Sequence, residues 1–319
     1  MTAESTGLAA SIHQRLLNLS KARSLDFNLL LTRFAIERFL YRLSQSPYAD
    51  AFVLKGAMLL QVWLADSSRP TRDLDLLGFG DVSAEWLSEL FATVCEQPVA
   101  ADGCQFHAKS VTVAAIRAGD EYGGRRVTLS GHLGSARLRI QVDVGIGDRV
   151  TPPAEWIDYP TLLDFPQPRL RAYRAETTVA EKLHAMVVLD LQNSRMKDFF
   201  DIWRLAQKYS FSGELLTAAV QDTFQHRRTA IPVGLRTAWT AGFGQNRGKA
   251  RQWQAFLKKN SLSHVAEDFN SVVGLLARFL GPVLQAARTD APLPMVWSPA
   301  GLWATEGDVD PKQRMPEVL

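Results

Sequence analysis

The sequence predicts an α+β protein in which helices come first, a small mixed sheet follows, and further helices complete the chain. Three patterns support this fold class. Apolar residues recur at helical spacing near the N-terminus, residues 136–146 alternate between apolar and polar positions, and helical spacing returns after residue 175. Helices and strands that are segregated along the chain in this way are typical of α+β folds.

The first fifty residues are expected to form two helices. Asp26 carries a short oxygen-bearing side chain of the kind that caps a helix N-terminus, so the second helix is expected over residues 27–43, ending before Pro47. One face of the first helix is marked by apolar residues at helical spacing, namely Leu8, Ile12, Leu16 and Leu19.

The strands are expected in the middle of the chain. A short apolar run at residues 52–54 ends at Lys55-Gly56-Ala57, which leads into a helix over residues 57–64. The clearest strand covers residues 136–146, because every second residue there is Leu, Ile, Val or Ala. Other extended segments are expected over residues 71–77, 111–118 and 127–133.

Proline-rich stretches separate the expected domains. A loop with several prolines precedes helices over residues 176–190, 195–208 and onward to 287. The last 29 residues hold five of the 15 prolines and are expected to be irregular. We therefore expect N-terminal helices (1–50), a core domain with the sheet (51–170), a helical domain (171–290) and a proline-rich tail (291–319).

Composition excludes several classes of protein. With 46% hydrophobic and 22% charged residues, the chain is typical of a globular protein rather than a collagen, a coiled coil or a disordered chain. No apolar run approaches the roughly 18 residues that span a bilayer, and from the pattern of residues 1–10 we expect no secretory signal. Two cysteines are too few for a disulfide framework, so we expect a cytoplasmic protein without a membrane partner.

Basic residues are concentrated late in the chain. The net charge is only +3, but residues 202–290 hold 12 basic and five acidic residues. This local excess is compatible with a polyanionic partner, and equally with a solvated helical surface.

Asp73 and Asp75 form the first group of candidate chemical residues. Residues two apart on a strand point to the same side, so both carboxylates are expected on one face. Two hard oxygen donors suit Mg²⁺, which completes its coordination with water and substrate phosphates. The alternative is an ordinary solvated strand end.

A glycine turn precedes this pair and a third carboxylate follows it. Gly56 would let backbone amides approach a phosphate, Lys55 and Arg72 add positive charge nearby, and Asp143 lies on the polar face of the clearest strand. This order resembles that of the polymerase-β-type nucleotidyltransferase fold, in which a glycine turn is followed by a helix, then by an Asp-x-Asp pair, and then by a carboxylate on a later strand.

Two later helices hold further candidates. Lys182 lies on an otherwise apolar helix, capped by Thr177 or Thr178, and could reach triphosphate oxygens, or could simply pair with Glu181. Asp198 shares a helix face with another aspartate three residues on, which suits support of a catalytic lysine but also ordinary charge patterning.

Four ordered motifs resemble the AbiEii/AbiGii nucleotidyltransferase toxin family. They lie within residues 27–205 and read LKGAML (54–59), RPTRDLD (69–75), AETTVAEKL (175–183) and NSRMKDFFD (193–201). The resemblance implies a polymerase-β-like nucleotidyltransferase domain followed by a helical domain. It implies that Gly56 and Ala57 form the phosphate-side turn, with Ala57 where many nucleotidyltransferases have serine.

The resemblance also implies roles for the other candidates. Asp73 and Asp75 would be catalytic metal ligands, Lys182 the triphosphate-binding lysine and Asp198 the late carboxylate, while Asp143 matches a metal ligand of the wider superfamily. Lys55 and Arg72 are further candidates for nucleotide binding.

The function expected from this resemblance is that of a toxin in a toxin–antitoxin pair. It would use Mg²⁺, with Mn²⁺ as the alternative ion, to move a nucleoside monophosphate from a nucleoside triphosphate to the 3′ end of tRNA, thereby blocking growth. A cognate antitoxin would be encoded nearby. The alternatives are nucleotidylation of a protein, such as AMPylation, and a non-catalytic protein that binds a nucleotide or a partner.

Overall fold

The computed structural model describes residues 3–64, 69–80, 82–116, 124–233, 241–265 and 267–305. Contacts within the chain define two compact units, and neither is a single stretch of sequence. Unit 1 consists of Met1–Val62, Pro70–Gly147 and Glu155–Ala172. Unit 2 consists of Trp63–Arg69, Asp148–Ala154 and Tyr173–Leu319.

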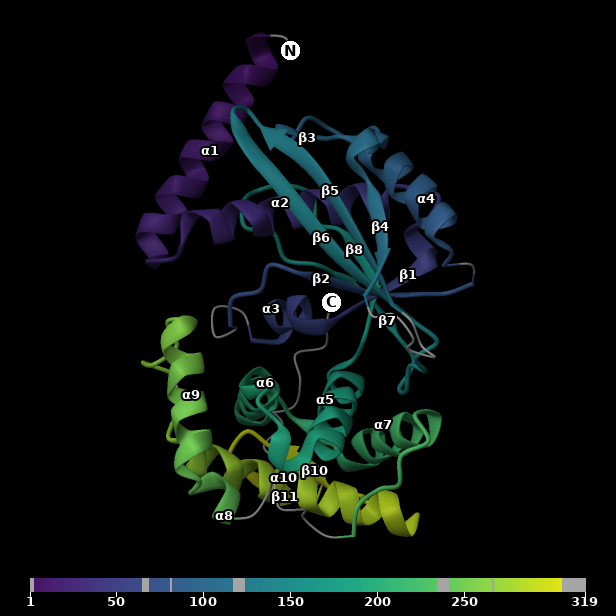
Figure 1. The fold of residues 1–319 in the computed structure, drawn as a ribbon, viewed down its shortest axis with the longest axis vertical. Helices are drawn as coiled ribbons and strands as arrows, with labels where there is room; N and C mark the ends of the chain where they lie inside the picture. The colour runs from purple at the N-terminus through teal and green to yellow at the C-terminus, as the bar shows by residue number, and fades with distance from the viewer. Residues whose placement is uncertain are drawn as a thin grey trace. The chain divides into compact units, whose positions relative to one another are not determined.

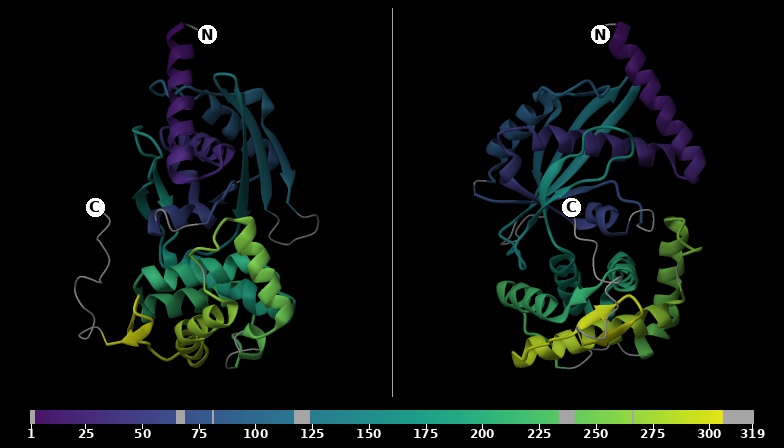
Figure 2. Two further views of the ribbon diagram at one scale, coloured as in Figure 1. Left: turned by 90° about the vertical axis from the view of Figure 1, so that its left-hand side faces the viewer. Right: turned by 180° about the vertical axis from the view of Figure 1, so that it is seen from behind.

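The N-terminal helices form as expected. Asp26 caps the second of them, because its Oδ1 accepts a hydrogen bond of 2.8 Å from the backbone N–H of Leu29. The first helix packs against the second and against one end of a long strand (Figures 1 and 2). The helices of this first part of the chain are α1 (Ala3–Arg23), α2 (Phe27–Ser44), the short α3 (Leu60–Leu64) and α4 (Ala84–Glu96).

Unit 1 is built on an eight-stranded mixed sheet, which is larger than the sequence indicated. The strand order is β3-β5-β6-β2-β1-β8-β7, with β4 paired to β5. β2–β6 and β1–β8 are parallel pairs, and the other pairs are antiparallel. The strands are β1 (Phe52–Lys55), β2 (Leu74–Gly78), β3 (Cys104–Phe106), β4 (Thr112–Ala115), β5 (Arg125–Leu133), β6 (Ala136–Ile146), β7 (Glu155–Asp158) and β8 (Arg169–Ala172).

Differences from the expected elements are local. The expected strand at 71–77 begins only at Leu74, and the expected helix at 57–64 is a 3₁₀ turn (Gly56–Leu59) followed by five residues of α-helix. The expected strand at 111–118 is β4, and residues 117 and 118 lie outside the described ranges. β6 has the bounds that its alternation predicts.

Helices cover one face of this sheet. The apolar residues of β6, from Leu138 to Val144, are buried, and both α2 and α4 contact the sheet. The rings of Phe39 on α2 and Phe91 on α4 stack with centroids 5.7 Å apart, so the two helices lie on the same side. The polar residues of β6 therefore point to the opposite face, where the candidate carboxylates lie.

Unit 2 is mainly helical, as expected. A three-stranded sheet, in the order β11-β10-β9, adds to the helices. Two of these strands lie in the segment expected to be irregular, where Trp297 is fully buried and donates to the carbonyl of Ala206 at 2.7 Å. The elements are α5 (Ala175–Leu189), α6 (Met196–Lys208), β9 (Phe211–Ser212), α7 (Gly213–His226), α8 (Ala241–Gly244), α9 (Arg247–Lys259), α10 (Phe269–Thr289), β10 (Val296–Ser298) and β11 (Leu302–Ala304).

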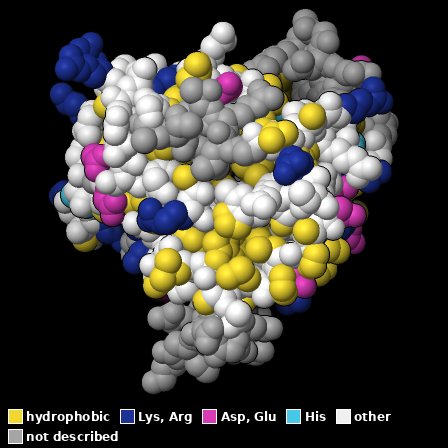
Figure 3. Space-filling view, turned by 90° about the horizontal axis from the view of Figure 1, so that it is seen from below, with side chains coloured by type: hydrophobic (Ala, Val, Ile, Leu, Met, Phe, Trp, Pro, Cys, Tyr) yellow, Lys and Arg dark blue, Asp and Glu magenta, His cyan; other side chains and the backbone are white. Residues whose placement is uncertain are grey.

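One helix among the described residues, α10, is long and apolar enough to cross a membrane by length and composition alone. Half of its apolar window is buried inside the protein, and Phe279 stacks on Trp303. Such burial is what a core helix of unit 2 requires. The face shown in Figure 3 also carries a group of exposed hydrophobic side chains.

Candidate active site

Gly56 and Asp75 are in direct contact at the end of β1. Gly56 has a φ of +75°, a conformation that L-residues other than glycine rarely adopt. A Cβ atom on residue 56 would also overlap the carboxylate of Asp75. Glycine is therefore required here both for the backbone conformation and for the position of the carboxylate.

The turn after Gly56 differs from the expected one. Ala57 is buried within the 3₁₀ turn Gly56–Leu59, and the following α-helix has only five residues. A full helix N-terminus, which would offer a row of free amides and an aligned dipole to a phosphate, does not form over these residues. Any phosphate contact at this turn depends on the backbone that the glycine leaves exposed.

Four charged residues form a row across neighbouring strands. Lys55 is the register partner of Asp75, Asp75 of Asp143, and Asp143 of Arg126. Register partners in a sheet point to the same face, so the charges follow one another as positive, negative, negative, positive. Both oxygens of Asp143 accept hydrogen bonds of 2.8 Å from Arg126.

Asp73 lies just before β2 and is exposed. Its Oδ1 accepts a hydrogen bond of 3.1 Å from Nε2 of Gln141, which lies two residues before Asp143 on β6. Arg72 points elsewhere, because its guanidinium lies 3.4 Å from the helix-capping carboxylate of Asp26. The structure thus groups Asp73, Asp75 and Asp143 and leaves Arg72 paired outside the group.

The donor set suits a divalent cation that takes only part of its coordination from protein. Within the described ranges no group of three or more His, Cys, Asp or Glu side chains is arranged to hold a metal by itself. Both oxygens of Asp143 are engaged by Arg126, and Asp73 and Asp75 are the other two hard oxygen donors of this group. Two carboxylates fit Mg²⁺, which takes its remaining ligands from water and triphosphate.

Lys182 lies in a buried cluster of charges in unit 2. Its Nζ donates to Asp198 at 3.0 Å and to Asp201 at 2.8 Å, and both carboxylates are fully buried. Asp201 also accepts two hydrogen bonds from Arg69, at 2.8 and 3.0 Å. Nε of Arg195 lies 2.7 Å from Asp198. Lys182 is therefore not the surface partner of Glu181.

The cluster favours the charged forms of Lys182 and Asp201. Burial lowers the pKa of Lys182, but Asp201 and Asp198 outweigh burial and raise that pKa above its ordinary 10.5. Burial likewise raises the pKa of Asp201, but Lys182 and Arg69 outweigh it and hold that pKa below 3.8. The stability that Lys182 contributes is therefore present below pH 10.5 and is lost as pH rises through its folded-state pKa. The contribution of Asp201 is present above pH 3.8 and is lost as pH falls through its folded-state pKa.

The cap expected for α5 is absent. The helix begins at Ala175, and its N-cap residue Arg174 makes no side-chain capping hydrogen bond. Thr177 lies in the first turn, and its hydroxyl donates to the carbonyl of Thr151 at 2.8 Å. The hydroxyl is used to hold residues 148–154 against the helix rather than to cap it.

Several late basic residues have partners within unit 2. Arg227 contacts Asp148 at 2.9 Å and Glu181 at 3.3 Å, so it is not available as a surface charge. Nζ of Lys249 donates to the carbonyl of Asn193 at 2.8 Å. His184 packs on Phe224, and burial together with Arg227 lowers its pKa to about 4.

Three residues in these groups were not assigned by the sequence. Asp201 was seen only as a neighbour of Asp198 on one helix face, and Arg69 only as part of a motif four residues before Asp73. Arg126 was not singled out, and its signal was the hairpin turn at Gly134-Ser135, which sets its register with Asp143. Asp198 and Asp201 lie three residues apart and therefore on one face of α6, and the neighbouring helix α5 carries one lysine, Lys182. Together these two features were the available hint that the aspartates share Lys182 as a partner.

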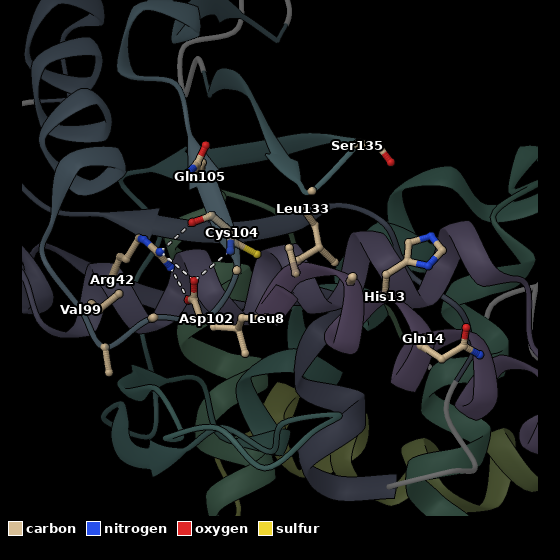
Figure 4. A pocket seen from close by; sticks show the side chains of 16 residues that line it. Leu8, His13, Gln14, Arg42, Val99, Asp102, Cys104, Gln105, Leu133 and Ser135 are labelled. Atoms are coloured by element: carbon tan, nitrogen blue, oxygen red, sulfur yellow. Dashed lines mark hydrogen bonds and ion pairs between the residues drawn. The ribbon is translucent and has the colours of Figure 1, made fainter. Parts of the chain in front are cut away.

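A separate cavity of about 800 Å³ lies in unit 1, beside α1 (Figure 4). In its wall Arg42 donates to Asp102 at 2.6 and 3.0 Å, and both side chains are buried. The pKa of Cys104, which also lines it, is raised by burial. None of the candidate catalytic or nucleotide-binding residues lines this cavity, so it is not part of the candidate active site.

A sequence model of one protein family matches most of the chain. The family is described as "Nucleotidyl transferase AbiEii toxin, Type IV TA system", and the match covers residues 38–274. A search of curated proteins found no match.

Two solved structures from Helicobacter pylori are similar at 15% sequence identity, each over 83% of this chain. One is JHP933, which is covered over 94% of its length at a TM-score of 0.47. The other is described as a candidate nucleotidyltransferase and is covered over 97% at a TM-score of 0.46.

Proposed function

The chain belongs to the AbiEii family of nucleotidyltransferase toxins of type IV toxin–antitoxin systems, and on this premise we propose that it transfers a nucleoside monophosphate from a nucleoside triphosphate to the 3′ end of a tRNA. The 3′-hydroxyl loses its proton to solvent as its oxygen forms a bond to the α-phosphorus. The bond between that phosphorus and the oxygen that bridges to the β-phosphate breaks, and pyrophosphate leaves. The modified tRNA can no longer serve translation, and growth stops. A cognate antitoxin encoded nearby and a cytoplasmic location complete the proposal.

One observation carries the proposal: the carboxylate of Asp75 lies against Gly56, with the exposed Asp73 two residues before it. A bare glycine beside paired carboxylates gives a triphosphate close access to the backbone and to two hard oxygen donors. Asp73 and Asp75 would hold Mg²⁺, or Mn²⁺ as the alternative ion. When bound, the ion would neutralise charge on the triphosphate and polarise the phosphoryl oxygens.

The remaining roles follow from charge and exposure. Lys182 binds the triphosphate through the third N–H of its ammonium group, which neither Asp198 nor Asp201 accepts. Asp198 helps to hold the ammonium in place by accepting one of the other two. Lys55 lies in register with Asp75 and offers positive charge to the nucleotide at the same row. Asp143 supports the row through Arg126 and is the third candidate metal ligand.

A labelling reaction tests the function. Purified protein is incubated with Mg²⁺, total cellular RNA and each of the four α-labelled nucleoside triphosphates in turn. We expect one nucleotide to label RNA of tRNA size, with label released by enzymes that act at the 3′ end. Label on protein instead would support protein nucleotidylation. Nucleotide binding without any label on RNA or protein would identify a non-catalytic binding protein.

The exposed face of α9 is the proposed contact for the RNA acceptor. The helix carries five basic residues and no acidic one, and it packs inward through Trp253 and Leu257. Arg247 and Arg251 are exposed, whereas Lys249 is tied to a carbonyl, and Arg236 lies outside the described residues. Phosphate contacts of this kind are independent of sequence, so the choice of RNA must come from its shape or its 3′ end.

Reversing the charge of Arg247 and Arg251 together is expected to raise the KM for RNA by about tenfold at low salt. Each lost phosphate contact should flatten the slope of log affinity against log salt by about 0.7–0.9, because fewer counterions are released. The matched control reverses Arg15 and Lys21 on α1, which changes the net charge equally. Equal KM values for the two double variants would show that α9 is only a solvated surface.

A further inference from the structure

Asp201 is the most heavily bonded carboxylate of the Lys182 cluster. Its Oδ1 accepts from Nε of Arg69, and its Oδ2 accepts from both Nη2 of Arg69 and Nζ of Lys182. The side chain of Asp201 is fully buried, and that of Arg69 is only 11% exposed. A planar guanidinium that binds both oxygens fixes the plane of the carboxylate as well as its position.

The Lys182 ammonium is only partly used by this arrangement. It has three N–H donors, and one goes to Asp198 and one to Asp201. Over the described ranges, no acceptor is found for the third, and 12% of the side chain remains exposed. Two fixed carboxylates therefore set the direction in which the third N–H points.

From this geometry we propose that Arg69 and Asp201 form a positioning pair, which fixes the Lys182 ammonium so that its third N–H is left to bind an oxygen of the triphosphate. This inference rests on the proposed function for the identity of the ligand. The pair itself touches no reacting atom and acts only through Lys182.

Asp198 is less suited to this positioning role. Its second oxygen lies next to Arg195, whose side chain is 47% exposed and contacts it through Nε. Arg69 holds Asp201 from a buried position and through two donors, which leaves that carboxylate one orientation. A carboxylate whose two oxygens are both held by a buried arginine places its lysine more accurately than one contacted by a half-exposed arginine.

The groups facing Lys182 also determine how its charge responds to pH. Asp198 and Asp201 on α6 oppose the desolvation of the ammonium, and Arg69 and Lys197 act against its charge. Removing the charge of Asp201 therefore leaves burial opposed by Asp198 alone. The loss of one opposite charge at this distance typically moves a pKa by about one to three units.

The test compares Asp201→Asn with Asp102→Asn. Asp102 forms another buried bidentate pair, with Arg42, so its variant reproduces the structural cost of breaking such a pair. The measurements are the pH profile of kcat/KM for the nucleoside triphosphate, the Tm, and ¹³Cε NMR titration of Lys182, assigned by its loss in Lys182→Arg. Arg69→Lys, which keeps the charge but loses the second donor, is the milder second variant.

We expect Asp201→Asn to lower kcat/KM at neutral pH by about 10–100-fold and to move the alkaline limb of its profile down by about one to three pH units. In wild type the Lys182 signal should remain that of the charged amine up to pH 10.5, and in Asp201→Asn it should titrate below that pH. Arg69→Lys should show the same changes to a smaller degree. Asp102→Asn should lower Tm without changing either titration.

Each possible outcome supports or overturns the inference. If Asp201→Asn lowers only Tm, as Asp102→Asn does, the pair is purely structural and the inference is wrong. If Asp201→Asn fails to fold, the same two titrations on Arg69→Lys distinguish a positioning role from a structural one. If the Lys182 titration shifts as expected but wild type transfers no nucleotide, the positioning stands and the proposed function fails.

Discussion

Replacing Asp75 with alanine is expected to lower kcat/KM for nucleotide transfer by about 10³-fold or more. A metal that neutralises phosphoryl charge contributes several kcal/mol to the transition state, and each 1.4 kcal/mol is about a factor of ten in rate. Asp73→Ala should have an effect of the same order, because the two carboxylates form one donor set. The measurement is transfer of labelled nucleotide at several Mg²⁺ concentrations.

The fold should tolerate the same change. Asp75 lies in register with Lys55 on one side and with Asp143 on the other, so its removal weakens attractions to nearby basic groups and also relieves a repulsion between carboxylates. The free energy of unfolding is expected to change by no more than about 1 kcal/mol. Asp164→Ala, at a fully exposed carboxylate of unit 1, is the matched control and should leave both activity and stability unchanged. Full activity in Asp75→Ala would overturn the two-carboxylate mechanism.

Gly56→Ala is expected to lower kcat/KM by about 10²-fold or more, although alanine adds only a methyl group. The new Cβ overlaps the carboxylate of Asp75, which must move, and a displacement of about 1 Å at a catalytic group costs about 10²-fold. The φ of +75° adds a backbone cost of about 1–2 kcal/mol for an L-residue. Activity and Tm measured on the same sample separate the two effects.

Gly80→Ala is the control for the backbone cost. Gly80 has a φ of +77°, and a Cβ there meets nothing within 4 Å. The two variants therefore share the strain but not the collision, and only Gly56→Ala should lose activity beyond its loss of stability. Equal activities of the two variants at a temperature where both are folded would show that the contact with Asp75 has no role in catalysis.

The sequence could predict elements whose signal is local. The alternation in residues 136–146 predicted the bounds of β6, and the capping preference of aspartate predicted where α2 begins. The buried position of Leu74 and Leu76, with Asp75 on the other face, also followed from a two-residue period. Such signals depend only on residues that are close in sequence, so they do not depend on the tertiary contacts of the rest of the chain.

Pairings across the fold were harder to predict, but one could have been found. Counting outward from the two-residue turn Gly134-Ser135 pairs Arg126 with Asp143, because a hairpin turn fixes the register of its strands. The arginine on Asp143 was therefore available from the turn position. The sequence pattern predicts Asp143 as a third candidate metal ligand, and that prediction did not include its arginine partner.

The surroundings of Lys182 could not be derived from spacing alone. Its partner Asp201 lies 19 residues away and Arg69 lies 132 residues from Asp201, and no local period connects these separations. A lysine on an apolar helix is compatible with a surface pair or with a buried one, and only tertiary packing decides between them. For the same reason the sequence predicts Thr177 as a helix cap, whereas its hydroxyl donates a hydrogen bond to the carbonyl of Thr151.

The discontinuous make-up of the two units limits how this protein can be divided or recombined. A fragment that ends at residue 172 would carry away Arg69, Asp148 and Thr151, whose partners Asp201, Arg227 and Thr177 lie in the remainder. The remainder would then hold the buried carboxylate of Asp201 without its arginine, which is a costly state. Exchange of whole segments between related genes at this boundary would separate the same partners, so the two units must be inherited together.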